Sequence, residues 1–232
     1  MERKALKETS RMVVKFGTGI LTSRSKQIDP GQIEQLVAQV AAQRQAGREI
    51  IVVSSGAVGA GMGVLAMDKR PTDLSDLQAC AAVGQSQLMS TYTELFARHN
   101  MQVAQVLLTH DDLEDKDRHL NARNTLVSLL DKGVVPIVNE NDAVSYTELK
   151  FGDNDWLAAL VACLLPADLL IILTTVDGLV ENFGKKKPST IPVVEKIDAD
   201  IQKLAGGTSS ATAIGGMEAK LRAARMLSLI HI

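Results

Sequence analysis

The chain has 232 residues, enough for one domain with a large core, and its hydrophobic share of 46% and charged share of 22% are typical of folded, water-soluble proteins. This balance argues against intrinsic disorder and against residence in a membrane. A formal net charge of −2 and only 3% aromatic residues also disfavour a surface that binds nucleic acid through basic and stacking side chains.

Short apolar runs alternate with helical periodicity along most of the chain, as is typical of βαβ units. We expect buried strands at residues 12–16, 49–53, 103–108, 134–138 and 169–173. We expect helices from Pro30 to a stop at Gly47, at residues 74–99, 156–165 and 217–229, and a charged helix ending near Lys132. Residues 144–151 and 176–194 interrupt the alternation as two excursions. The pattern predicts an α/β fold, a three-layer sandwich with a mainly parallel central sheet, in one domain.

The location of the protein is predicted from its apolar stretches and its cysteines. The longest apolar stretch, residues 157–173, is interrupted by Pro166 and Asp168 and is shorter than the roughly 20 residues that span a bilayer. The charged N-terminal residues have no apolar run behind them, so we expect no secretory signal. Cys80 and Cys163 lie among Ala and Leu, where buried reduced thiols are usual. These features predict a cytoplasmic protein without membrane partners.

Polar residues follow several predicted strands, at the edge where parallel α/β sheets bind their ligands. Residues 17–19 (GTG) come directly after the first strand, and Lys15 stands at that strand's end. A glycine turn beside a cation outlines a phosphate site, although a lone lysine at a strand end is more often a surface residue. Residues 54–56 (SSG) follow the second strand, and Thr174 and Thr175 follow the last one.

Two clusters of acidic and amide residues lie close together in the sequence, at residues 139–142 (NEND) and 152–155 (GDND). Taken singly, the first could be an ordinary turn and the second a helix N-cap. Because they flank one short excursion, they could also present amides and carboxylates to a small zwitterion, with the carboxylates facing its ammonium group.

Other chemistries are disfavoured by spacing. Residues 56–61 carry the glycines of the dinucleotide-binding fingerprint in reversed order, and no acidic residue closes a following strand about 20 residues later. The four histidines are scattered without zinc-ligand spacing, and neither Ser54 nor Ser55 lies in a G-x-S-x-G motif. Phosphoryl transfer remains, because it needs little from a protein beyond positioning and positive charge.

With these segments in order, residues 11–226 resemble the amino acid kinase family. The segments that carry the resemblance are VVKFGTGILT (13–22), IIVVSSGAVGAG (50–61), ACAAVGQSQLM (79–89), LNARNTL (120–126), VPIVNENDAV (135–144), FGDND (151–155) and GGMEAK (215–220). The segments SSGAVGAG, AAVGQ, NENDAV and GDND are similar to the branch of the family whose acceptor is free glutamate.

The resemblance implies a role for individual residues. It assigns catalysis to Lys15, Asp155 and Lys220, with Asp155 organising the two lysines, and glutamate binding to Ser55, Asp142 and Asn154. It assigns ATP binding to Lys15, Gly17, Thr18, Thr174, Thr175, Gly215, Gly216, Met217 and Lys220. Mg²⁺ is expected to arrive on the nucleotide, without a metal site made by the protein.

The activity that the resemblance implies is ATP-dependent phosphorylation of the γ-carboxylate of L-glutamate to L-glutamyl 5-phosphate, the first step of proline biosynthesis. Other acceptors of the family, such as N-acetylglutamate, aspartate, carbamate or UMP, and a non-catalytic protein that binds nucleotide or amino acid, remain as alternatives. A homo-oligomer, feedback by proline and functional coupling to glutamyl-phosphate reductase are further expectations of the resemblance, which the sequence itself does not decide.

Three features depart from the family's pattern. Ile214 precedes Gly215 and Gly216 where a threonine is usual, and Glu218-Ala219 follows where small hydroxyl residues are usual. The acidic residue after Thr175 stands at Asp177, one place later than is often found. The family's catalytic domain continues beyond the last predicted helix, and many members add a PUA domain. The sequence is therefore expected to form a kinase domain that is short at its C-terminal end and has no PUA domain.

Overall fold

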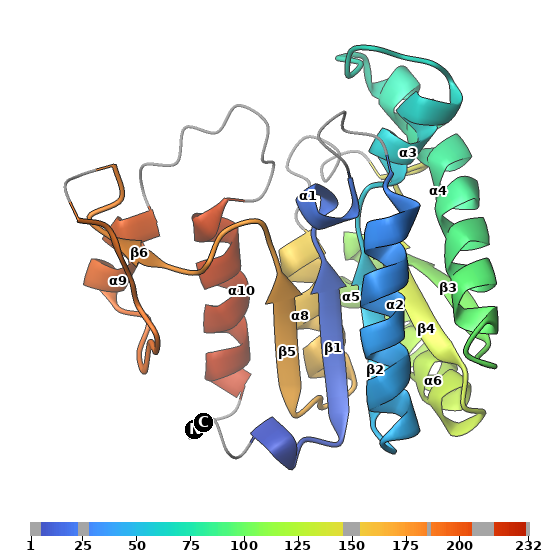
Figure 1. Ribbon diagram of the computed structural model, residues 1–232. Coiled ribbons are helices and arrows are strands. Elements are labelled where there is room, and N and C mark those ends of the chain that lie inside the picture. Colours follow the sequence, from blue (N-terminus) through green and yellow to red (C-terminus); the bar gives the residue numbers. More distant parts are fainter. Residues whose placement is uncertain (1–5, 23–27, 146–153, 185–186, 206–215, 231–232) are drawn as a thin grey trace.

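The structure is a computed structural model, in which residues 6–22, 28–145, 154–184, 187–205 and 216–230 are described. Its centre is a five-stranded parallel sheet with the order β3-β4-β2-β1-β5 (Figure 1). The strands are β1 (Arg11–Phe16), β2 (Glu49–Ser54), β3 (Val103–Leu108), β4 (Val135–Glu140) and β5 (Leu169–Leu173). Parallel pairing brings the carboxyl ends of all five strands to one edge, which positions the candidate site.

Helices cover both faces of this sheet. The helices among the described residues are α1 (Thr18–Leu21), α2 (Pro30–Gln45), α3 (Ala57–Val64), α4 (Leu74–Ala97), α5 (His110–Glu114), α6 (Lys116–Asp131), α8 (Asn154–Leu164), α9 (Ala199–Ala205) and α10 (Met217–Ile230). In Figure 1, α2 and α4 lie in front of the sheet, and α6 and α8 lie behind it. The predicted three-layer α/β sandwich with a parallel sheet is therefore confirmed.

The side-chain alternation along the strands divides the core in two. Met12, Val14 and Phe16 of β1 share one cluster of buried residues with α2 and α4, which also contains Ile33 and Leu88. Val13 of β1, with Ile51 and Val53 of β2, faces the opposite way into a cluster that contains Leu126 of α6 and Leu157 of α8. Successive strand residues thus point to opposite layers, so a residue's position in a strand decides which helix it meets.

Helices α3 and α4 approach closely because each has a glycine at their contact. A Cβ atom on Gly84 would lie 1.8 Å from the carbonyl oxygen of Ala57, and one on Gly61 would lie 1.8 Å from that of Cys80. Neither position has room for a larger side chain, since the conflicting atoms belong to the backbone. Gly56, in the left-handed conformation at φ 95°, turns the chain from β2 into α3. Together these glycines hold α4 near the carboxyl end of β2.

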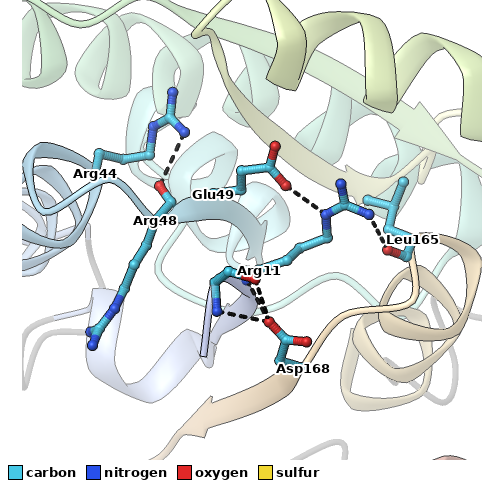
Figure 2. Close-up of polar contacts among 7 residues, drawn as sticks. Arg11, Arg44, Arg48, Glu49, Leu165 and Asp168 are labelled. Carbon is cyan, nitrogen blue, oxygen red and sulfur yellow. Dashed lines mark hydrogen bonds and ion pairs between the residues drawn. The ribbon is translucent and has the colours of Figure 1, made fainter. Parts of the chain in front are cut away.

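Charged residues tie β1 to its neighbours at the amino-terminal end of the sheet (Figure 2). One carboxylate oxygen of Asp168 accepts from the backbone N–H groups of Ser10 and Arg11 at 2.7 and 2.8 Å, and from the Ser10 hydroxyl at 2.8 Å. The Arg11 guanidinium lies 2.7 Å from Glu49 and donates to the carbonyl oxygen of Leu165 at 2.6 Å. These contacts join the starts of β1, β2 and β5.

Most predicted elements agree with the structure, and the differences are informative. Strands 103–108 and 169–173 have the predicted bounds, but β4 extends through Asn139 and Glu140, two residues beyond the predicted end of the strand. Excursion 176–194 contains the antiparallel pair β6 (Val180–Glu181) and β7 (Ser189–Thr190). Most of the excursion expected at 144–151 lies outside the described residues. The short helices α1 and α9 were not predicted, because four and seven residues carry little periodicity.

The expectations about cysteines and membrane segments can be compared with the same structure. Cys80 is buried and Cys163 is partly buried, and both are free thiols. Burial raises the pKa of each thiol, which keeps it in the unreactive protonated form. Among the described residues, no helix combines the length and apolar character that crossing a membrane requires.

Candidate active site

Lys15 is the next-to-last residue of β1, and its direction follows from strand alternation. It lies on the same side as Val13, which faces α8, and it pairs in the sheet with Val53 of β2 and Ile172 of β5. Both neighbouring strands flank it, so its side chain is only 10% exposed. A lysine buried to this degree needs a counter-ion, and this distinguishes Lys15 from an ordinary surface lysine.

Asp155 in the first turn of α8 supplies that counter-ion. Its Oδ1 lies 2.7 Å from Nζ of Lys15, and its Oδ2 accepts a hydrogen bond of 2.9 Å from Nζ of Lys220. The Asp155 side chain is 1% exposed and that of Lys220 17% exposed. Two ammonium groups and one carboxylate thus meet in a largely water-excluded place. Such a cluster is suited to binding an anion.

Small side chains allow α10 to bring Lys220 to this position. Ala219 and Ala223 of α10 are buried, and Ala158, Ala159 and Ala162 of α8 are buried likewise. Alanine faces permit two helices to pack closely, and α8 and α10 are in contact in the structure. Lys220 lies one turn into α10 and reaches the buried Asp155 of α8 from there, so the cluster joins β1, α8 and α10.

Asn154, which precedes Asp155, ties α8 to the ends of two strands. Its Nδ2 donates to the carbonyl oxygen of Ser54 at 2.6 Å, to Oγ of Ser55 at 3.0 Å and to Oδ1 of Asn139 at 2.9 Å. The pairing of β2 with β4 runs through Val53 and Val138. One residue further along, the Asn154 amide links Ser54 of β2 to Asn139 of β4 through its own hydrogen bonds.

The end of β2 is also held from the opposite layer. The Ser54 hydroxyl lies 2.9 Å from the hydroxyl of Tyr92, which is fully buried on α4. Burial raises the pKa of Tyr92 well above its ordinary value, against the smaller opposing effect of the Ser54 hydrogen bond. Tyr92 is therefore a neutral structural partner of this strand end. Ser54 faces α4 and Ser55 faces α8, as alternation requires.

The first and last strands meet in the glycine turn. The Gly17 N–H donates to the carbonyl oxygen of Leu173 at 3.3 Å, and a Cβ on Gly17 would lie 3.0 Å from that oxygen. A Cβ on Gly19 would lie 2.8 Å from Cγ2 of Thr175. The structure thus brings residues 17–19 and residues 174–175 together above Lys15. The Gly17 N–H is therefore paired with the end of β5.

A cavity of about 420 Å³ lies beside the strand ends. Residues from α4, β3 and the end of β4 line it, among them Gln85, Gln105, Glu140 and Asp142. Asp142 is partly buried, and Ala57, two residues after Ser55, also lines the cavity. The three residues expected at the amino acid site therefore lie in two adjoining places, with Ser55 and Asn154 in contact and Asp142 on the cavity wall.

The expected phosphate-binding residues before α10 lie only partly within the described residues. Gly215 and Ile214 lie outside the described residues. Gly216 precedes α10, its carbonyl oxygen accepts from the backbone N–H of Lys220 at 3.4 Å, and Met217 begins the helix. Asn139 and Gln85 belong to the site's hydrogen bonds but were not singled out from the sequence. The NEND cluster contains Asn139, whereas Gln85 has no local signal beyond its place in the family-like segment AAVGQ.

Comparison with known proteins bears on this arrangement. The model of the family described as "Amino acid kinase family" matches residues 10–228. The chain belongs to the amino acid kinase family. It is similar in structure to the carbamate kinase from Giardia lamblia bound to AMP-PNP, with a TM-score of 0.59 over 96% of this chain and 90% of the other. At 15% identity this likeness supports the amino acid kinase fold alone.

Closer relatives within the family are proteins named glutamate 5-kinase. The Azoarcus protein is 48% identical over 225 residues, that from Pseudomonas putida 49% identical over 218 residues, and that from Moorella thermoacetica 46% identical over 232 residues. These alignments cover 96%, 93% and 99% of this chain. The chain spans about three fifths of the length of each relative, with 61%, 59% and 61% covered.

Proposed function

We propose that this chain transfers the γ-phosphoryl group of ATP to the γ-carboxylate of L-glutamate, forming L-glutamyl 5-phosphate, the first step of proline biosynthesis. The observation that carries the proposal is the convergence of Lys15 and Lys220 on buried Asp155, directly beside the Asn154–Ser55 contact. Relatives named glutamate 5-kinase, 46–49% identical to this chain, support the same assignment.

The nucleotide is proposed to lie at the ends of β1 and β5. Lys15 and Lys220 would face its phosphates, with Gly17, Thr18, Gly215, Gly216 and Met217 around them and Thr174 and Thr175 at the adjoining loop. The two ammonium groups of the Lys15–Asp155–Lys220 cluster fit a polyphosphate. Within the described ranges, no group of three or more His, Cys, Asp or Glu side chains is placed to hold a metal ion. We propose that Mg²⁺ comes with the nucleotide and neutralises phosphate charge when bound.

The reaction requires charge stabilisation more than proton transfer. A γ-carboxylate has a reference pKa of about 4.3, so it is ionised at neutral pH and attacks without a general base. Its oxygen forms a bond to the γ-phosphorus while the bond from that phosphorus to the bridging oxygen breaks, and ADP leaves with the electron pair. Lys15 and Lys220 stabilise the negative charge on the transferring group, and Asp155 holds the two ammonium groups in place.

Ser55, Asp142 and Asn154 are proposed to bind the acceptor. A carboxylate at Asp142 suits the ammonium group of a free amino acid, and acetylation of the acceptor would remove that charge. The carboxylate of Asp142 would then lose its partner on binding, which costs several kcal/mol for a desolvated group. Aspartate is one methylene shorter, so its carboxylate would stop about 1 Å short of the position that the glutamate carboxylate takes and react about 10²-fold more slowly.

Acceptor choice tests the proposal. The protein is incubated with ATP, Mg²⁺, hydroxylamine and one acceptor at a time, because hydroxylamine converts an acyl phosphate to a coloured hydroxamate. We expect hydroxamate from L-glutamate and little from N-acetylglutamate or aspartate. Lys15→Ala, purified in the same way, controls for contaminating enzymes. Product from N-acetylglutamate alone would overturn the assignment of L-glutamate as the acceptor. ATP binding without product from any acceptor would favour a non-catalytic binding protein.

Five wider expectations belong to the same proposal. We propose that residues 1–232 belong to one amino acid kinase domain, and that the protein acts in the cytoplasm. We further propose a homo-oligomer, and proline feedback with coupling to glutamyl-phosphate reductase. Gel filtration with light scattering tests the oligomer, and hydroxamate formation with added proline tests the feedback.

A further inference from the structure

Four amide side chains form one continuous chain of hydrogen bonds across the carboxyl end of the sheet. Nδ2 of Asn154 donates to Oδ1 of Asn139 at 2.9 Å, and Nδ2 of Asn139 donates to Oε1 of Gln85 at 2.8 Å. Nε2 of Gln85 then donates to Oε1 of Gln105 at 3.1 Å. The chain runs from α8 through β4 and α4 to β3, and each of the first three members donates to the next.

Direction matters because the two ends of an amide group have the same shape but opposite hydrogen-bonding roles. If the Asn139 amide were reversed, its NH₂ group would face the NH₂ group of Asn154, and its oxygen would face Oε1 of Gln85. Asn139 is 1% exposed and Gln85 is 8% exposed, so water is largely excluded as a replacement partner. Leaving such buried groups unpaired costs about 1–3 kcal/mol each.

Local contacts alone do not fully determine this direction. Oδ1 of Asn139 also accepts from the backbone N–H of Glu140 at 2.9 Å, which favours the observed orientation. On the other side of the group, Gln85 supplies the acceptor for the Asn139 NH₂. Gln85 lies next to Gly84, whose contact with Ala57 holds this turn of α4 against α3. The oxygen that accepts the hydrogen bond from Asn139 therefore belongs to a closely packed turn of α4.

We infer that Gln85 is a positioning residue, which orients the Asn139 amide and, through it, the Asn154 amide. In this orientation Oδ1 of Asn154 faces the amino acid that accepts the phosphoryl group. The Asn154 NH₂ is committed to Ser54, Ser55 and Asn139. Its carbonyl oxygen can then accept from an ammonium group. The ligand chemistry rests on the proposed function: a free amino acid donates hydrogen bonds from its ammonium group to such an oxygen.

The first experiment replaces Gln85 by methionine, which has a similar length but cannot accept from Asn139. We expect the KM for L-glutamate to rise about tenfold, the effect of about 1.4 kcal/mol, with kcat and the KM for ATP changed less than about twofold. Gln87→Met is the matched control, because Gln87 is exposed on the same helix. An unchanged KM for glutamate, or equal rises for glutamate and ATP, would overturn the inference.

A second pair of variants, made in Asn139→Asp, tests whether Gln85 acts by orienting Asn139 or only by packing. In Asn139→Asp the two carboxylate oxygens are equivalent, so reversal no longer matters and Asn154 has an acceptor in either orientation. Adding Gln85→Met to this background should raise the KM for glutamate less than about twofold. The melting temperature should fall in both backgrounds, because a hydrogen bond is lost in each. An equal rise in KM in both backgrounds would show that Gln85 acts only through packing.

A conservative variant covers the case in which Asn139→Asp does not fold. Gln85→Glu keeps an oxygen that accepts from Asn139, so its KM for glutamate should return to within about threefold of the unmodified protein. A KM as high as that of Gln85→Met would contradict the positioning role.

A measurement without substrate distinguishes failure of this inference from failure of the proposed function. In protein labelled with ¹⁵N-asparagine, Gln85→Met should shift the side-chain NH₂ signals of Asn139 and Asn154 and speed their hydrogen exchange. Shifted signals in a protein that makes no hydroxamate would reject the proposed function and keep the positioning role. Unchanged signals in an active protein would reject the positioning role alone.

Discussion

At the amino-terminal end of the sheet, Arg11 faces one carboxylate, Glu49, and Asp168 accepts three hydrogen bonds from Ser10 and Arg11. At the carboxyl-terminal end, the single carboxylate of Asp155 faces two lysines. In the first cluster the Arg11–Glu49 pair is balanced in charge and partly exposed, with 29% and 34% of the two side chains accessible, and Asp168 is exposed. In the second, two ammonium groups share one carboxylate that is 1% exposed.

The difference separates a structural cluster from a chemical one. Balanced pairs at an exposed sheet end contribute modestly to stability, because water competes for the same groups. Two ammonium groups held in place by one buried carboxylate are preorganised to bind an anionic ligand. Burial and the ratio of cations to carboxylates thus distinguish the end of the sheet that holds the candidate site.

The largest expected effect breaks the cluster at the carboxyl-terminal end. Lys15→Ala and Lys220→Ala should each lower kcat for hydroxamate formation by about 10²-fold or more, since each removes a preorganised charge from the transferring phosphoryl group. Asp155→Asn should do similar damage by releasing both lysines. Circular dichroism should show an intact fold. Lys203→Ala, which removes an exposed lysine of α9, is the control and should keep full activity. Full activity in Lys220→Ala would remove α10 from the proposed site.

A smaller effect, on stability alone, is expected at the amino-terminal end. Asp168→Ala removes the acceptor of three hydrogen bonds, and because the residue is exposed we expect a loss of about 1 kcal/mol in unfolding free energy. The kcat should not change. Asp131→Ala makes the same charge change at an exposed position of α6 and should be near neutral. A fall in kcat with Asp168→Ala would show that the two ends are coupled.

The same residue should give a pH-dependent signature. The backbone N–H of Arg11, followed by the N–H and hydroxyl of Ser10, holds the pKa of Asp168 below its ordinary value. A pKa lowered by folding gives stability that is present above the unfolded pKa of about 3.9 and is lost as the pH falls through the folded value. The stability gap between the unmodified protein and Asp168→Asn should be constant near neutral pH and shrink below about pH 4. Urea unfolding across this range measures it, and a gap that widens in acid would contradict the assignment.

The smallest effect is expected from Glu49→Gln. The Arg11–Glu49 contact is about one third exposed, so neutralising Glu49 should cost less than about 1 kcal/mol and leave kcat unchanged. Paired thermal melts of the two proteins give the difference. A loss above about 2 kcal/mol would mean that the charges of the amino-terminal cluster contribute far more to stability than their exposure allows.

The sequence predicted the five strands because buried parallel strands have continuous apolar runs, and it predicted which residues meet at their carboxyl ends because those ends lie side by side. Alternation also accounts for the direction of Lys15 once the layer containing Val13 is known. The amide chain could not be predicted in this way. Gln85 lies in the middle of a long helix, and its contact with Asn139 spans 54 residues of sequence. Such a pairing depends on how closely α4 approaches the sheet, which local patterns do not report.

The distances along the chain between contacting residues have a consequence for how the site is made. Lys220 and Asp155 are 65 residues apart, Asn154 and Ser54 are 100 apart, and Asp168 and Ser10 are 158 apart. Contacts of such long range form slowly in folding, because each closes a large loop before it contributes stability. We therefore expect helix signals to return early in refolding and ATP binding to return with the slowest phase. During synthesis, β1 can pair with β5 only after residues 169–173 have been made.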